Sequence, residues 1–194
     1  MSFLLNLPTL LRMARRTVST PREGARTMMD LELPRGVLLQ FYLLELVISA
    51  MFKTIVYAFV PAPDGVAIPV QTATTLTVFE AIVGLVVVFA AYRIGRAVGG
   101  TGSFDQSLTL VVWAQFILLC LNAAQVVALV LMPPVADVLM LVGLALFFWL
   151  AVHFVAELHG FDSLGLVFGG IILSLLALAV LLSILFSAMG LRIL

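Results

Sequence analysis

The stretch VADVLMLVGLALFFWLAVHFVAEL, residues 135–158, decides the fold. Every residue between Asp137 and His153 is apolar or glycine. A helix that crosses a bilayer needs about 20 mostly apolar residues, and this stretch is long enough. Continuous apolar runs are typical of membrane helices, whereas a membrane β-barrel needs alternating polar and apolar residues. The stretch therefore predicts an all-α integral membrane protein.

Four other stretches have the same character. Together with residues 135–158, the predicted spans are about 36–60, 71–92, 107–132 and 163–189. Prolines and glycines separate them, including the turn at 61–65, Pro69, the pair Pro133–Pro134, and Gly160, which suits a left-handed helix C-cap. Short connectors predict antiparallel neighbours in a compact bundle. We expect a cytoplasmic amphipathic arm, residues 1–35, and a five-helix transmembrane domain, residues 36–194.

The composition excludes several classes of protein. The 194 residues are 63% hydrophobic and 10% charged, whereas soluble domains are roughly 45–50% apolar and about 25% charged. A soluble enzyme is therefore excluded. Ten basic residues balance ten acidic ones, so no basic field attracts nucleic acid. Cys120 is the only cysteine, which excludes an internal disulfide and a cysteine-rich metal site.

The basic residues predict the orientation in the membrane. Six arginines precede the first span, and Arg93 and Arg96 follow the second. The connectors after the first and third spans contain no Lys or Arg, and Arg192 stands alone near the end of the sequence. Because basic residues stay on the cytoplasmic side, we expect a cytoplasmic N-terminus, five spans and an external C-terminus.

The arm is predicted to hold two short helices. In the first, Leu7, Leu10, Leu11, Ala14 and Val18 share an apolar face. Its arginines lie on another face, where they would meet anionic lipid headgroups: Arg12, Arg15 and Arg16. The second helix should begin at Pro21, with Thr20 and Glu23 forming a capping box. Two alternatives are that the arginines serve only to set the topology, or that they bind a partner.

Polar side chains at membrane depth need an explanation, because a charge at the bilayer centre costs at least about 2.5–3.5 kcal/mol. From a rise of about 1.5 Å per residue, they fall into two layers, roughly 10–15 Å and roughly 22–27 Å from the outer end. The outer layer consists of Lys53, Glu80, Asn122 and Gln125. The inner layer consists of Glu45, Gln115 and His153.

Lys53 and Glu80 are opposite charges at matched depth, so we predict an ion pair between the first two spans. Glu45 has no such cation nearby, and it is expected either to be protonated or to meet His153. Three roles are compatible with these polar groups: they hold the helices together, form a proton or ion path, or recognise another membrane protein.

No catalytic, cofactor or metal site is predicted. His153 and Glu157 are one helical turn apart, which favours a hydrogen-bonded pair over a metal site. The loop Gly100-Thr101-Gly102-Ser103 has no following lysine and no preceding strand, so it is not a phosphate loop. The small residues of Gly165-x-x-x-Gly169 favour close helix packing, within the chain rather than between two copies.

Five stretches, taken together in their order and spacing, resemble a known family. They are Pro21-Arg22-Glu23-Gly24-Ala25-Arg26, Leu33-Pro34-Arg35-Gly36, Gly99-Gly100-Thr101-Gly102-Ser103-Phe104, Val111-Val112-Trp113 and Ala156-Glu157-Leu158-His159-Gly160-Phe161. The chain is similar over nearly its whole length to the Ypt-interacting-protein (Yip) family, in its bacterial branch.

The resemblance implies five spans, a cytoplasmic N-terminus and a bacterial inner-membrane location. Eukaryotic members act as membrane adaptors for Rab-type GTPases, but this sequence lacks their Asp-Leu-Tyr-Gly-Pro-type segment. The resemblance implies packing and cytoplasmic-loop roles, and no catalysis, for one set of residues: Gly102, Phe104, Glu157, His159 and Gly160.

These features favour a non-enzymatic membrane scaffold or adaptor without a cofactor. It would recognise lipids or other membrane proteins, in membrane organisation or trafficking. One alternative is a small transporter of protons, ions or solutes that uses the intramembrane carboxylates. Another is an accessory subunit of a larger membrane complex. The sequence leaves open whether the chain forms oligomers.

Overall fold

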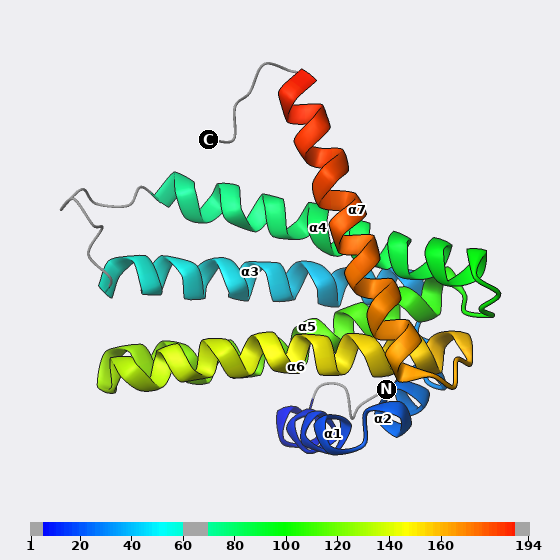
Figure 1. Cartoon of the computed structure of the whole chain (residues 1–194). Coiled ribbons are helices and arrows are strands. Elements are labelled where there is room, and N and C mark those ends of the chain that lie inside the picture. Colours follow the sequence, from blue (N-terminus) through cyan, green and yellow to red (C-terminus); the bar gives the residue numbers. More distant parts are fainter. Residues whose placement is uncertain (1–5, 60–69, 189–194) are drawn as a thin grey trace.

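The computed structural model describes residues 6–59 and 70–188, and side chains within 6–58 and 73–180. Across these ranges the chain forms helices and no strands, so the all-α prediction is confirmed for the described residues (Figure 1). The helices are α1 (Leu7–Ser19), α2 (Pro21–Met29), α3 (Arg35–Phe59), α4 (Val70–Ala97), α5 (Phe104–Leu131), α6 (Pro133–His159) and α7 (Leu164–Ala188).

Four of these helices are long and apolar enough to cross a membrane. The qualifying segments are Arg35–Ala58, Ala73–Ala97, Phe104–Leu131 and Pro133–His159. Their outward surfaces expose large apolar side chains such as Leu43, Phe79 and Leu141, as a lipid-facing surface requires. The predicted turn at 61–65, Pro69, and the end of the chain from residue 189 lie outside the described residues.

Local chemistry sets the helix ends. Pro133 begins α6, and Gly160 ends it in the predicted left-handed conformation, at φ 70°. Ser103 and Gln106 form a reciprocal capping box that starts α5. The capping box predicted at Thr20 and Glu23 is wrong. Because α1 and α2 are separated by one residue, the Thr20 hydroxyl instead donates to the Arg16 carbonyl of the preceding helix.

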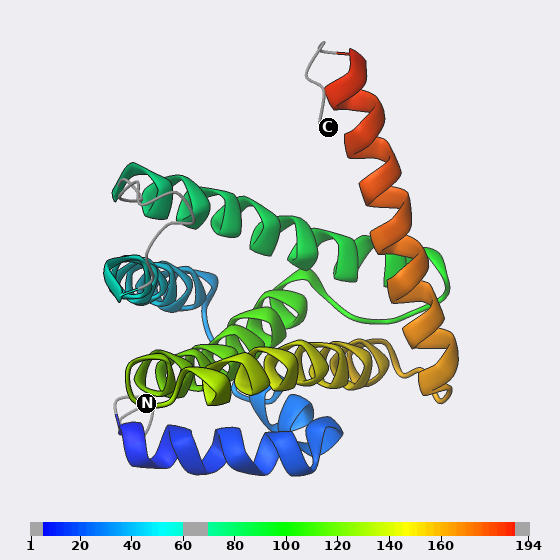
Figure 2. The same ribbon diagram turned by 60° about the vertical axis from the view of Figure 1, so that its left-hand side comes forward.

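Helix α7 does not run alongside α6. In both views it crosses the direction of α3–α6 (Figures 1 and 2). Among the described residues, no atom outside the neighbouring turns of α7 lies within 4 Å of where a Cβ would stand on Gly165, Gly169 or Gly170. The predicted antiparallel placement of this helix and the packing role of its glycines within the chain are therefore wrong. A fifth span remains a prediction.

The arm folds into a helical hairpin against the bundle. Helix α2 packs on α5 and α6, and α1 packs on α2, with the hairpin beside α6 in Figure 2. Ala14, Ala25 and Met28 are buried with residues of α5 and α6 such as Leu150. Leu7 and Leu11, predicted on the same face as Ala14, are exposed. Part of the predicted lipid-facing surface thus packs against protein, whereas the three arginines of α1 are exposed: Arg12, Arg15 and Arg16.

Candidate functional site

The buried imidazole of His159 ties three segments together where the bundle carries the α4–α5 and α6–α7 connectors. Its Nδ1 accepts a hydrogen bond from the Gly102 N–H at 3.2 Å, and its Nε2 lies 2.9 Å from the Ala91 carbonyl oxygen. An amide can only donate and a carbonyl can only accept, so these partners assign the neutral tautomer with the proton on Nε2. One side chain therefore joins the end of α6 to α4 and to the α4–α5 connector.

Glycines make this approach possible. A Cβ on Gly95 or Gly100 would overlap the His159 ring, and one on Gly102 would stand 2.6 Å from Leu158 Cγ. Real Cβ atoms do not come so close to other heavy atoms, so each position has room only for hydrogen. This close contact explains by packing why position 102 is a glycine.

The arm is held to the end of α6 by two arginines. Arg26 donates to Glu157 Oε1 from Nε at 2.9 Å and from Nη2 at 2.6 Å. Arg22 donates to the Phe161 carbonyl at 2.8 Å. The hydrogen bond and the charge of Glu157 raise the pKa of the Arg26 guanidinium above its ordinary value. Arg22 and Arg26 are one turn apart on α2, so both reach the same end of α6.

Two tryptophans add hydrogen bonds between the arm and the bundle. Trp113 of α5 donates from Nε1 to Thr17 Oγ1 at 3.1 Å. Trp149 of α6 donates to the Val18 carbonyl, also at 3.1 Å. Both acceptors lie near the C-terminal end of α1, so the arm is held at the turn between its helices as well as at α2.

The predicted pairing of His153 with Glu157 is wrong. His153 Nδ1 lies 2.7 Å from the Trp149 carbonyl oxygen, and its ring lies against the Trp149 indole at 4.1 Å between centroids. Glu157 is engaged by Arg26 instead. The spacing on one helix suggested a local pair, but the arm supplies a stronger, charge-assisted partner for the carboxylate.

A second cluster joins the start of α3 to the start of α5. Arg35 Nε lies 2.7 Å from Asp105 Oδ1. The Arg35 guanidinium also lies over the Phe104 ring at 5.2 Å, and this ring meets Tyr92 edge-on at 6.1 Å. Phe104 thus packs between the ends of α3 and α4, which fixes the connector that precedes it.

The contacts around His159 and Arg26, together with the cluster around Arg35, form what we call the arm junction. Its members are Arg22, Arg26, Arg35, Gly102, Phe104, Asp105, Glu157, His159 and Phe161. Segments that are far apart in the sequence, around residues 22, 102 and 159, meet there. From the sequence, Arg22, Arg26 and Arg35 are topology-setting charges that also stand in the stretches resembling the family. Their pairing with Phe161, Glu157 and Asp105 was not predicted, because these contacts depend on how the helices fold back on one another.

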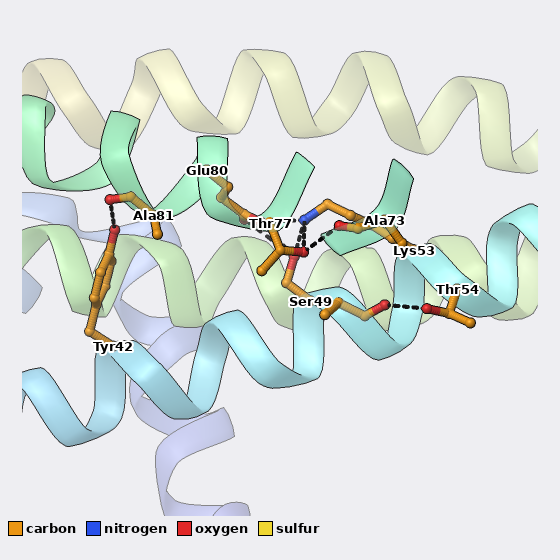
Figure 3. Close-up of polar contacts among 9 residues, drawn as sticks. Tyr42, Ser49, Lys53, Thr54, Ala73, Thr77, Glu80 and Ala81 are labelled. Carbon is orange, nitrogen blue, oxygen red and sulfur yellow. Dashed lines mark hydrogen bonds and ion pairs between the residues drawn. The ribbon is translucent and has the colours of Figure 1, made fainter. Parts of the chain in front are cut away.

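At membrane depth, Lys53 of α3 pairs with Glu80 of α4, as predicted (Figure 3). Ser49 donates to Glu80 Oε2 at 2.9 Å. Lys53 Nζ lies 2.9 Å from Ser49 Oγ and 3.4 Å from Thr77 Oγ1. The ammonium therefore has one carboxylate and two hydroxyl partners. Ser49 and Thr77 were not predicted, although Ser49 stands one turn before Lys53.

The other deep polar groups do not join this pair in one layer. Gln125 donates to the Ala136 carbonyl at 3.4 Å, and Asn122 is exposed. Glu45 Oε2 and Gln115 Oε1 are buried with no hydrogen-bond partner. His153 is hydrogen-bonded within α6 and does not meet Glu45. The two predicted layers are thus separate local contacts rather than a continuous network.

Within the part of the chain that the structure describes, no group of three or more His, Cys, Asp or Glu side chains is arranged to hold a metal ion. The arm junction consists of structural hydrogen bonds and ion pairs between helices. This arrangement offers a charged surface at one end of the bundle.

Comparison with protein families matches residues 15–185 to the Yip1 domain. Comparison with curated proteins and with solved structures returned no match. The matched range extends from within α1 into α7 and contains the whole arm junction. Because the match covers most of the sequence, the chain belongs to the Yip1-domain family.

Proposed function

We propose that the chain is a non-enzymatic membrane adaptor that uses the arm and the two connectors beside it to recognise other membrane proteins or lipids. The observation that carries this proposal is the docked arm. Hydrogen bonds from Arg22, Arg26, Trp113 and Trp149 hold α1 and α2 in place. They leave the three arginines of α1 exposed beside the bundle: Arg12, Arg15 and Arg16. A fixed basic surface of this kind suits anionic headgroups or an acidic partner.

The proposed topology has five spans, a cytoplasmic N-terminus and an external C-terminus, in a bacterial inner membrane. The charge distribution supports it, since eight arginines lie in or beside the arm and the α4–α5 connector. Helix α7 is apolar along its whole described length, which favours hydrocarbon as its surroundings. Single-cysteine labelling from either side of the membrane, in a Cys120→Ser background, tests both ends.

Affinity purification in mild detergent tests the adaptor role. The variant Arg12→Gln/Arg15→Gln/Arg16→Gln removes the basic surface and leaves the arm junction intact. Its matched control is Asp137→Asn, which changes an exposed charge at the opposite end of the bundle. We expect a stoichiometric partner that the triple variant loses and the control keeps. A wild-type protein that purifies without any partner or bound anionic lipid would count against the proposal.

A second candidate is transport, favoured by the carboxylates at membrane depth. Glu80 is paired, whereas Glu45 is buried without a hydrogen-bond partner for Oε2. Proteoliposomes loaded with a pH indicator test this function directly. Proton flux that is lost in Glu45→Gln and in Glu80→Gln would favour transport over the adaptor role.

A further inference from the structure

A pocket of about 50 Å³ lies between the arm and helices α3 and α5. The arm closes one side with Leu10 and Met28. The bundle contributes Phe41, Glu45, Trp113 and Phe116 among its walls. The pocket is therefore mostly apolar and aromatic, with a carboxyl group in its wall.

Glu45 is the unusual member of this lining. Its side chain belongs to a residue that is only 9% exposed, and Oε2 has no hydrogen-bond partner. A buried carboxylate without a partner is costly. The described residues that line the pocket include no Lys, Arg or His, so the chain itself offers Glu45 no counter-ion there.

The hydrogen-bonding groups of the pocket indicate the kind of ligand that would fit it. Thr109 also lines it, and its hydroxyl hydrogen is used by the Asp105 carbonyl at 2.9 Å. The Trp113 N–H is used by Thr17. With Glu45 ionised, what remains is a set of acceptors, so a fitting ligand must bring donors and a positive charge. Three of the lining residues are aromatic, namely Phe41, Trp113 and Phe116, and aromatic rings tolerate a neighbouring cation.

We propose that this pocket binds the primary ammonium group of a lipophilic amine, with Glu45 as its counter-ion. A –NH₃⁺ group is compact and carries three donors, which matches the small volume and the acceptor-only lining. The same helix already holds an ammonium in this way eight residues further on, where Lys53 meets Glu80, Ser49 and Thr77. The amine is carried either by an aminophospholipid headgroup or by a free alkylamine. This site goes beyond the proposed adaptor function and does not involve the exposed arginines of α1.

Isothermal titration calorimetry tests the proposal in the full-length wild-type protein, which keeps the Trp149 hydrogen bond that holds the arm beside the pocket. The purified protein is titrated with n-octylamine, and with n-octanol as the uncharged match. We expect saturable binding of octylamine but not of octanol. Glu45→Gln should weaken octylamine binding at least tenfold, while Asp137→Asn, far from the pocket, should not change it.

Two short-chain lipids distinguish the sources of the amine. Dihexanoyl phosphatidylethanolamine carries a primary ammonium, and dihexanoyl phosphatidylcholine carries a quaternary one. Competition with octylamine by the first alone identifies the headgroup as the ligand, and competition by neither identifies a free amine. Equal binding of octylamine and octanol, or full octylamine binding by folded Glu45→Gln, would overturn the proposal.

A second measurement uses the wild-type chain and so does not depend on the folding of a variant. Dicyclohexylcarbodiimide modifies carboxyl groups in apolar surroundings, and peptide mass spectrometry locates the adduct. A bound primary amine attacks the carbodiimide-activated carboxyl and forms an amide, with dicyclohexylurea as the leaving group. Octylamine should therefore replace the N-acylurea adduct at Glu45 by the octylamide, whereas octanol should leave the N-acylurea yield unchanged. An unchanged N-acylurea yield at saturating octylamine would show that the amine does not occupy this pocket.

Discussion

The two ends of the α6–α7 connector differ sharply in how they are held. On one side, the end of α6 is fixed by directed contacts, with Glu157 bound by Arg26 and His159 bound by Gly102 and Ala91. On the other side, α7 crosses the bundle and exposes apolar residues such as Leu166, at 79%, and Leu173, at 69%. Hydrogen bonds thus specify the geometry at the arm junction, whereas α7 depends on surroundings that the described residues do not supply.

The largest effect is expected at the centre of the arm junction. His159→Ala removes a buried ring and leaves the Gly102 N–H without its partner, whereas the Ala91 carbonyl keeps its acceptor role within α4. One unsatisfied buried group costs about 1–3 kcal/mol, and the cavity adds to this. Unfolding in mixed micelles of increasing dodecyl sulfate content measures the loss. His159→Asn, whose Oδ1 can accept from Gly102, should recover part of it, and equal losses in the two variants would contradict the assigned hydrogen bonds.

A comparable effect is expected at membrane depth, away from the arm junction. Lys53→Ala leaves Glu80 without its cation. Breaking a fully buried pair costs about 3–5 kcal/mol, and the loss here should lie below that range, because the two side chains are only partly buried. The charge swap Lys53→Glu/Glu80→Lys keeps opposite signs at the same depth and should restore most of the yield and stability. The same unfolding assay serves here. Full stability of the single variant would mean that the pair contributes nothing to the fold.

A smaller effect is expected inside the arm. A Cβ on Gly24 would stand 2.6 Å from Thr17 Cγ2, so Gly24→Ala should separate α1 from α2 at a cost of about 1–3 kcal/mol. Gly36→Ala is the matched control, since nothing lies within 4 Å of its Cβ position. The control should be neutral or slightly stabilising, because alanine favours helix over glycine by up to about 1 kcal/mol. Faster hydrogen exchange of α1 amides in Gly24→Ala alone would report the separation.

The sequence predicted what depends on composition and on position along one helix. Apolar runs located α3–α6, Gly160 marked the end of α6, and matched depth paired Lys53 with Glu80. It failed where a contact depends on how the chain folds back. Glu157 was assigned to His153 on its own helix, but the arm brings Arg26 to it. The direction of α7 was also missed, because a short connector limits the distance between two helices but not the angle at which they cross.

The smallest effect is expected in α7. It tests most directly the difference between the fixed end of α6 and the exposed helix α7. Leu150 of α6 is fully buried, so Leu150→Ala should cost about 2–5 kcal/mol. Leu173 of α7 makes no comparable contacts within the chain, so Leu173→Ala should change the unfolding free energy by no more than about 0.5 kcal/mol. Equal losses at the two positions would mean that α7 is packed against protein, and a loss that grows with protein concentration would identify that protein as a second copy. A loss confined to Leu150 would indicate that lipid covers α7. A leucine and an alanine that both face hydrocarbon are shielded from water to nearly the same degree, so exchanging them changes the stability little.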